Sequence, residues 1–176
     1  MMGKLAYLRK LGINSIWLTG HNWADNDHFY GIWTQYATIL PDSIDPSLGT
    51  TEDFKLLIKK AHKNGINIFL DVITHGVMTG SPLIKQHPDW FKGGYWGMTD
   101  YDWKGGHKDL DNWWIKTWTD YALKYNIDGF RLDVSISRPD LWKQIKLICA
   151  QAGRPIIVLN EGSDPFTEGA YKGQTT

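Results

Sequence analysis

The sequence is poor in cysteine and has no excess of charge of either sign. Its one cysteine, Cys149, rules out a disulfide within the chain and is compatible with a reducing compartment. Lysine plus arginine equal aspartate plus glutamate at 19 each. Because no basic cluster is present, we expect neither nucleic acid nor an anionic membrane surface as a partner.

The sequence also lacks any apolar run of membrane-spanning length. Its first residues, MMGKLAYLRKLG, form a short amphipathic pattern instead of the continuous apolar core of a secretory signal. The location is therefore unknown from the sequence, with the cytoplasm favoured over export. A glycine-rich phosphate loop is missing too, since WLTGHNW after the first expected strand holds one glycine, which argues against a nucleotide-binding sheet.

The sequence is rich in aromatic residues, including ten tryptophans, in a chain of ordinary domain size with 176 residues. Several lie between Pro88 and Trp103, in PDWFKGGYWGMTDYDW, where glycine, proline and aspartate argue against a buried helix or strand. Exposed flat rings are natural platforms for sugar rings. Trp96 and Trp103 are the candidates for sugar binding, and packing of the loop against its own scaffold is the alternative.

Apolar runs typical of strands alternate with helical patterns along the chain. The expected strands are INSIWLT, residues 36–40, INIFLDVI, DGFRLDV and PIIVLNE, and the expected helices lie near residues 2–11, 51–64, 111–125 and 139–152. Strands separated by helices predict an α/β fold with parallel pairing, either an open doubly wound sheet or a (β/α) barrel. Five strands are too few for a closed TIM-type (β/α)8 barrel, so we expect an incomplete barrel of about the first five β/α units.

Acidic side chains stand at or near the ends of three successive strands, at Asp71, Asp133 and Glu161. The carboxyl ends of parallel strands form the face on which α/β proteins build their sites. In DGFRLDV, strand alternation also puts Arg131 and Asp133 on one face, away from the apolar residues. A functional carboxyl cluster and a structural ion pair both fit this pattern.

The motifs GINIFLDVI, DGFRLDV and IIVLNEG, in this order, resemble those of the alpha-amylase family of glycoside hydrolases, family 13. They are preceded by YGIWTQYATILPDSIDPSLGTTEDFKLLIKKAHKNG, which is also similar to that family. The resemblance runs from the first helix to Gly162. It implies one partial barrel domain over residues 1–176, with a long loop insertion at about 76–110. HKDLD, which contains Asp109 and Asp111 and lies upstream of DGFRLDV, is similar to a further short motif of the family.

The resemblance implies a role for each acid. Asp133 matches the nucleophile, Glu161 the general acid/base, Arg131 the arginine that orients the nucleophile, and Asp71 a supporting, substrate-binding acid. A retaining glycosidase needs two carboxyl groups roughly 5 Å apart, one ionised and one protonated. We expect Arg131 to favour the ionised form of Asp133, and a more desolvated Glu161 to keep its proton.

The sequence departs from the family pattern at several binding positions. His75 lies one residue earlier than the usual histidine, and Gly76 takes its place, so His75 is either a sugar contact or a structural histidine. Ile32 stands where a sugar-stacking tyrosine is common, so either Tyr30 is its substitute or that contact is absent. No cofactor is expected, and the loss of an asparagine weakens a calcium site, for which Asp109 is the remaining candidate ligand.

The resemblance implies an enzyme that cleaves or transfers α-glucosidic bonds in an α-glucan or oligosaccharide with retention. A catalytically inactive carbohydrate-binding fragment or pseudoenzyme is the alternative, and an open-sheet protein whose acids bind a metal is a third. Because an unclosed parallel sheet exposes its edges, we expect the remainder of a barrel or self-association to cover them.

Overall fold

The computed structural model describes residues 1–25, 35–134 and 138–161 of the chain. Its centre is a four-stranded parallel sheet, in the order β1-β4-β7-β8. The strands are β1 (Ser15–Leu18), β4 (Asn67–Ile73), β7 (Gly129–Asp133) and β8 (Ile157–Asn160). The helices are α1 (Leu5–Lys10), preceded by a 3-10 turn η1 (Met2–Lys4), then α2 (Thr51–Lys63), α4 (Lys108–Tyr125) and α5 (Pro139–Gln151). A helix lies between each strand of this sheet and the next, so the fold is a partial α/β barrel, as predicted.

The number of barrel strands was overestimated by one for the described residues. The segment expected as a strand at 36–40 forms β3 (Thr38–Ile44), which pairs antiparallel with β2 (Asn22–Ala24) in a separate two-stranded sheet. An apolar run predicts an extended backbone but not its partner, and here the partner is a neighbour that runs in the opposite direction. The parallel sheet therefore contains four β/α strands instead of five.

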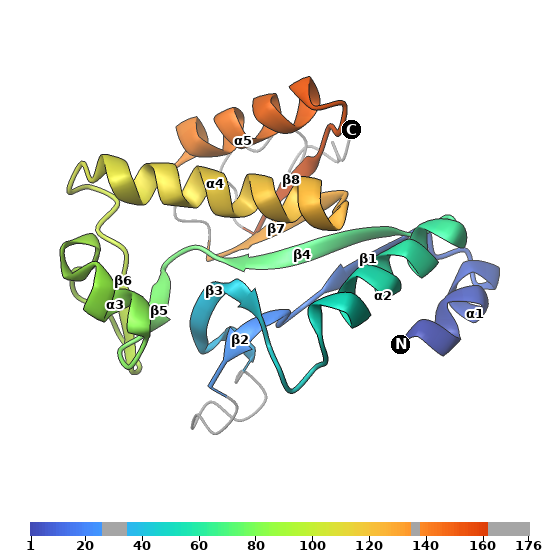
Figure 1. Ribbon diagram of the computed structural model, residues 1–176, viewed down its shortest axis with the longest axis horizontal. Helices are drawn as coiled ribbons and strands as arrows, with labels where there is room; N and C mark the ends of the chain where they lie inside the picture. Colours follow the sequence, from blue (N-terminus) through green and yellow to red (C-terminus); the bar gives the residue numbers. More distant parts are fainter. Residues whose placement is uncertain (26–34, 135–137, 162–176) are drawn as a thin grey trace.

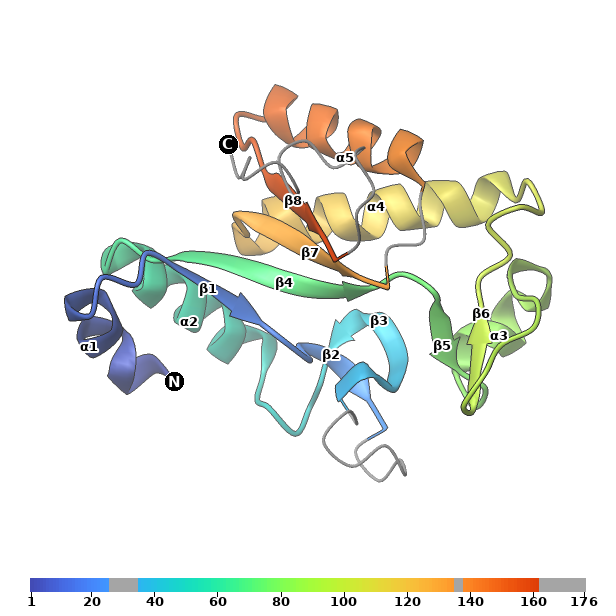
Figure 2. The ribbon, with the colours of Figure 1, turned by 180° about the vertical axis from the view of Figure 1, so that it is seen from behind.

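Helix α2 forms where the sequence predicts it, because its first turn is capped. The Thr50 hydroxyl accepts from the Asp53 N–H at 3.1 Å, and the Asp53 carboxylate accepts from the Thr50 N–H at 3.0 Å. This reciprocal capping box satisfies two N–H groups that a helix end leaves without partners. Helix α2 lies with α4 on the same side of the sheet (Figures 1 and 2).

The core lies between the sheet and these helices. Phe130 and Leu132 on β7 are fully buried, and the Phe130 ring centroid lies 5.6 Å from that of Trp118 and 5.8 Å from that of Trp142. Cys149 on α5 is buried in the same core and is a packed thiol. Because strand side chains alternate, the residues between these apolar positions point to the opposite face of the sheet.

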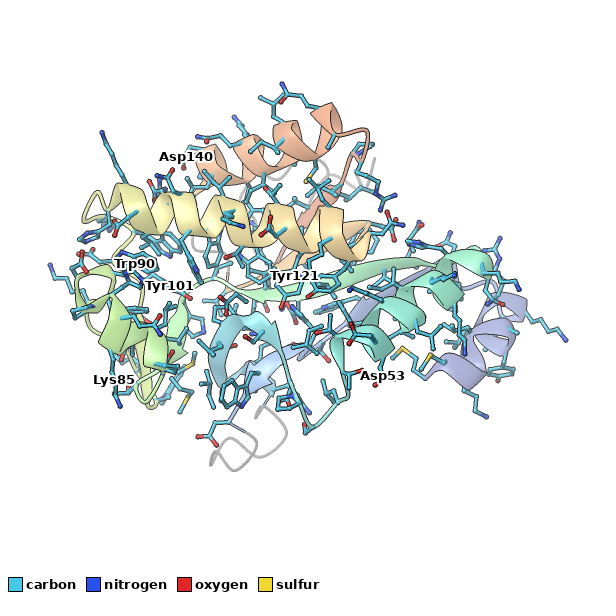
Figure 3. All side chains as sticks on the ribbon, in the orientation of Figure 1. Asp53, Lys85, Trp90, Tyr101, Tyr121 and Asp140 are labelled. Carbon is cyan, nitrogen blue, oxygen red and sulfur yellow. The ribbon has the colours of Figure 1, made fainter. Side chains whose placement is uncertain are left out.

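The segment from 76 to 110 has short elements of its own. These are β5 (Gly76–Met78), α3 (Pro82–Gln86), a 3-10 turn η3 (Pro88–Trp90) and β6 (Met98–Asp100), with β5 and β6 antiparallel. Its Trp90 and Tyr101 are buried where the segment meets α4 (Figure 3). Much of the aromatic content of this segment therefore packs the segment onto the helix.

No helix among the described residues is both long enough and apolar enough to cross a membrane.

Candidate active site

The pairing of β4 with β7 brings the predicted site residues together. Asp71 lies opposite Arg131, and Ile73 lies opposite Asp133. In parallel strands, paired residues point to the same face, so Asp71 and Arg131 are neighbours there. Glu161 follows β8 directly, and its backbone N–H donates to the carbonyl of Leu132 at 3.3 Å. The strand ends thus converge as the sequence predicts.

One guanidinium group contacts all three carboxyl groups. Arg131 Nη1 lies 2.9 Å from Asp71 Oδ1 and 2.5 Å from Asp133 Oδ1, and Nη2 lies 2.9 Å from Glu161 Oε1. Asp133 and Glu161 therefore face the same small space and are held by adjacent nitrogens of one planar group. The ion pair read from DGFRLDV exists, and it belongs to a larger cluster.

Burial is distributed over the three acids differently from our expectation. The side chain of Asp71 is 1% exposed, that of Asp133 is 13% exposed and that of Glu161 is 48% exposed. The expectation that Glu161 is the more desolvated of the catalytic pair is thus wrong for this chain. The desolvation cost falls on Asp133, which lies at the end of a central strand, whereas Glu161 lies beyond an edge strand.

Desolvation has the largest effect on the pKa of Asp133. Burial raises the pKa of Asp133 to about 6, although the Arg131 guanidinium acts to lower it. Burial likewise raises the pKa of Asp71 against the opposing effect of Arg131. Arg131 favours the ionised form of Asp133, as expected, but the removal of this carboxylate from water outweighs a nearby cation that is shared among three acids.

Two residues of the site were missed by the sequence analysis. The Tyr36 hydroxyl donates to Asp71 Oδ2 at 2.8 Å, and burial raises the pKa of Tyr36. The Arg131 guanidinium carbon lies 4.6 Å from the ring centroid of Trp17, which is a cation–π distance. Strand alternation places Trp17 opposite the apolar face of β1 and could have suggested it, whereas no spacing rule points to Tyr36.

Gly76 lies too close to the neighbouring strand for a side chain. A Cβ at Gly76 would lie 2.1 Å from the carbonyl oxygen of Thr99 on the neighbouring strand, so the chain cannot carry histidine there without moving. His75 is partly buried, and its Nδ1 lies 3.7 Å from Asp100 Oδ1. Burial lowers the pKa of His75. A neutral His75 next to Asp100 fits both a structural and a sugar-binding role.

Of the remaining predicted binding residues, Trp96 and Trp103 lie in the 76–110 segment. Trp96 is 76% exposed in the segment between β5 and β6. Trp103 packs edge-to-face on Trp114 with ring centroids 5.0 Å apart, and its indole N–H donates to the carbonyl of Thr74 at 2.9 Å. Tyr30 lies outside the described residues.

Asp109 belongs to a small cluster with Asp89 and His107, whose ligand atoms lie within 4.8 Å of one another. One Asp109 oxygen accepts from the Trp90 indole N–H at 2.6 Å. Calcium takes six to eight oxygen ligands, while two carboxylates and an imidazole supply few oxygens. These residues alone therefore fit calcium poorly.

The raised pKa of Asp133 predicts a pH dependence of stability. A carboxyl group whose pKa is about 6 in the folded chain binds a proton between pH 4 and 6 that the unfolded chain has released. The free energy of unfolding should therefore fall by about 3 kcal/mol from this group as the pH rises through that range. Asp133→Asn should remove this part of the slope, as measured by urea unfolding at several pH values. A difference between parent and variant that does not change with pH would contradict the assignment.

Comparison with known proteins places this geometry in context. The family model for the alpha amylase catalytic domain matches residues 1–81. An intracellular maltogenic amylase of Bacillus subtilis is 25% identical over 96% of this chain and 32% of its own length. A cyclomaltodextrinase of Thermoanaerobacter pseudethanolicus is 25% identical over 92% of this chain and 32% of its own length.

Solved structures agree with these matches. A noncanonic maltogenic alpha-amylase from Thermotoga neapolitana superposes with a TM-score of 0.82 at 26% identity, over 97% of this chain and 42% of that protein. An alpha-amylase from Lactobacillus plantarum superposes with a TM-score of 0.80 at 26% identity, over 92% of this chain and 40% of that protein. The chain thus spans about a third of the length of the curated relatives that it matches.

Proposed function

We propose that the carboxyl cluster of this chain, which is similar in sequence and fold to the alpha-amylase family of glycoside hydrolases, cleaves or transfers α-glucosidic bonds with retention of configuration. The observation that carries the proposal is the contact of one guanidinium, that of Arg131, with both Asp133 and Glu161. A double displacement requires two carboxyl groups across one glycosidic bond, and this contact supports such a pair.

The proposed mechanism assigns one step to each acid. The ionised carboxylate of Asp133 attacks the anomeric carbon, while Glu161 gives its proton to the departing glycosidic oxygen. Glu161 then takes a proton from water or from a sugar hydroxyl. The oxygen of that molecule attacks the anomeric carbon, the bond to Asp133 breaks, and hydrolysis or transfer is complete. Because burial raises the pKa of Asp133, the positive charge of Arg131 is needed to keep this carboxylate ionised near neutral pH.

Asp71 is proposed to hold Arg131 in place and, through Arg131, to support the binding of substrate. Its Oδ1 accepts from Arg131, while its Oδ2 accepts from the Tyr36 hydroxyl, so both oxygens of this buried carboxylate are used within the protein. A fixed Asp71 fixes the guanidinium plane. That in turn sets the direction in which Asp133 and Glu161 face.

The substrate is proposed to be an α-glucan or a maltooligosaccharide. The names of the relatives, a maltogenic amylase and a cyclomaltodextrinase, support this class. We further propose His75, Tyr30, Trp96 and Trp103 as sugar contacts, with Trp103 restricted to its ring because its N–H is already bound. Calcium at Asp109 is not part of this proposal, because Asp89, His107 and Asp109 fit the ion poorly.

The domain organisation is also a proposal. Residues 1–176 are taken as one partial barrel domain, with residues 76–110 as a loop insertion after β4. We propose that the exposed edges of the sheet, β1 and β8, are covered by the remainder of a barrel or by a second copy of the chain.

Incubation with maltotriose tests the proposed function. We expect release of shorter sugars, detected by chromatography, by the 176-residue chain itself. Maltotriose binding measured by calorimetry, without any release of product, would overturn the proposed activity and support the carbohydrate-binding alternative. If the chain neither bound nor cleaved maltotriose, the proposed activity and the carbohydrate-binding alternative would both be overturned.

A further inference from the structure

The peptide unit that joins Asp133 to Val134 is held by a side chain at each end. Its carbonyl oxygen, which belongs to Asp133, accepts a hydrogen bond from the Thr74 hydroxyl at 2.6 Å. Its N–H, which belongs to Val134, donates to Glu161 Oε2 at 2.8 Å. A peptide unit is planar, so fixing its oxygen also fixes the direction of its N–H.

The backbone conformation of Val134 depends on these two hydrogen bonds. Val134 has a φ of 57°, in the left-handed region that β-branched residues avoid. Such a conformation costs on the order of 1–3 kcal/mol and persists only where the surrounding structure enforces it. If the hydroxyl of Thr74 were removed, the peptide would be free to rotate toward an ordinary conformation, and the N–H would turn away from Glu161.

Thr74 is itself held firmly in position. It is buried at the end of β4, and its carbonyl accepts the indole N–H of Trp103 at 2.9 Å. The Trp103 ring packs against Tyr101 and Trp114, with centroid distances of 5.1 and 5.0 Å. The position of the hydroxyl is thus set by the packing of the 76–110 segment on α4.

Glu161 needs an external constraint more than the other two acids do. Its side chain is 48% exposed, while those of Asp71 and Asp133 are largely buried and held by packing. Arg131 Nη2 contacts Oε1 of Glu161, and the Val134 N–H contacts Oε2. With one oxygen on each donor, the plane of this carboxyl group is defined.

We infer that Thr74 is a positioning residue, which orients the carboxyl group of Glu161 through the Asp133–Val134 peptide. Thr74 touches neither substrate nor the reacting atoms in this account. The inference rests on the proposed function for its kinetic consequence, because Glu161 is the proposed proton donor. Its structural part, the direction of the Val134 N–H, is independent of any activity.

The kinetic test compares Thr74→Val, which keeps the shape and loses the hydroxyl, with Thr74→Ser, which keeps the hydroxyl. Thr74→Val should lower kcat on maltotriose roughly 10-fold to 100-fold with KM nearly unchanged, because proton donation is impaired. Thr74→Ser should restore most of the loss. On α-maltosyl fluoride, whose fluoride leaves without protonation, the first turnover should release fluoride almost as fast in Thr74→Val as in the parent, because Glu161 acts as a base only in the second step. Equal losses on both substrates, or no rescue by serine, would overturn the inference.

A nuclear magnetic resonance measurement tests the structural part even if the chain turns over no sugar. At one fixed pH, the Val134 amide proton signal should move upfield in Glu161→Ala, because the hydrogen bond of this amide to Glu161 Oε2 is lost. Its hydrogen exchange should be at least several-fold faster in Thr74→Val than in the parent or in Thr74→Ser. An amide that is insensitive to both substitutions would refute the positioning role, while the proposed function would be judged separately by the maltotriose assay.

Discussion

Asp133→Asn is expected to lower maltotriose turnover by about 10⁴-fold, since the amide cannot form the glycosyl-enzyme bond. The side chain keeps its size and its place at the end of β7, and Arg131 keeps its contacts with Asp71 and Glu161. Binding of maltotriose should therefore stay within a few-fold of the parent. The measurement is product release over time, together with calorimetric titration of the sugar.

The matched control for this variant is Asp120→Asn. Asp120 lies on the exposed side of α4, where it pairs with Lys116, away from the carboxyl cluster. This control should turn over sugar at the parent rate. If Asp133→Asn retained more than a tenth of the parent rate, Asp133 would not be the nucleophile.

Arg131→Met is expected to destabilise the fold at pH 7 by about 3–5 kcal/mol. The substitution keeps much of the volume and leaves the buried Asp71 and Asp133 without their shared cation, so that two carboxyl groups face each other in a poorly solvated site. Both acids would take up protons more readily. The deficit should therefore shrink toward pH 4, as measured by urea unfolding of parent and variant.

Lys116→Met provides the comparison for an exposed cation. The ion pair of Lys116 with Asp120 is exposed on α4, and such pairs contribute about 0–1 kcal/mol. A similar small effect of Arg131→Met, or a deficit that is as large at pH 4 as at pH 7, would show that the three carboxyl groups do not depend on this guanidinium.

The parts of the site that the sequence predicts are those set by strand alternation and strand order. Arg131 and Asp133 share a face because they are two residues apart in a strand, and Asp71 joins them because parallel strands end at one edge. Glu161 also joins them, because it comes directly after β8, which is parallel to β7. The partial barrel is likewise predictable, because each helix is bounded by local signals such as the capping box at Thr50.

The parts that escaped prediction depend on contacts between distant segments. The hydrogen bond of Tyr36 to Asp71 and the steric limit at Gly76 exist only once separate strands are side by side. The balance between desolvation and charge at Asp133 depends on burial in three dimensions, which a sequence does not state. The antiparallel pairing of β3 was missed for the same reason, since a strand pattern does not name its partner.

Trapping of the glycosyl-enzyme intermediate tests the central claim most directly. The chain would be incubated with 5-fluoro-α-D-glucosyl fluoride, a reagent that forms the covalent intermediate readily and releases it slowly, and then digested for peptide mass spectrometry. We expect the mass of one fluoroglucosyl group on Asp133, with no label in Asp133→Asn. A label on a different residue, or a chain that stays unlabelled, would contradict the account.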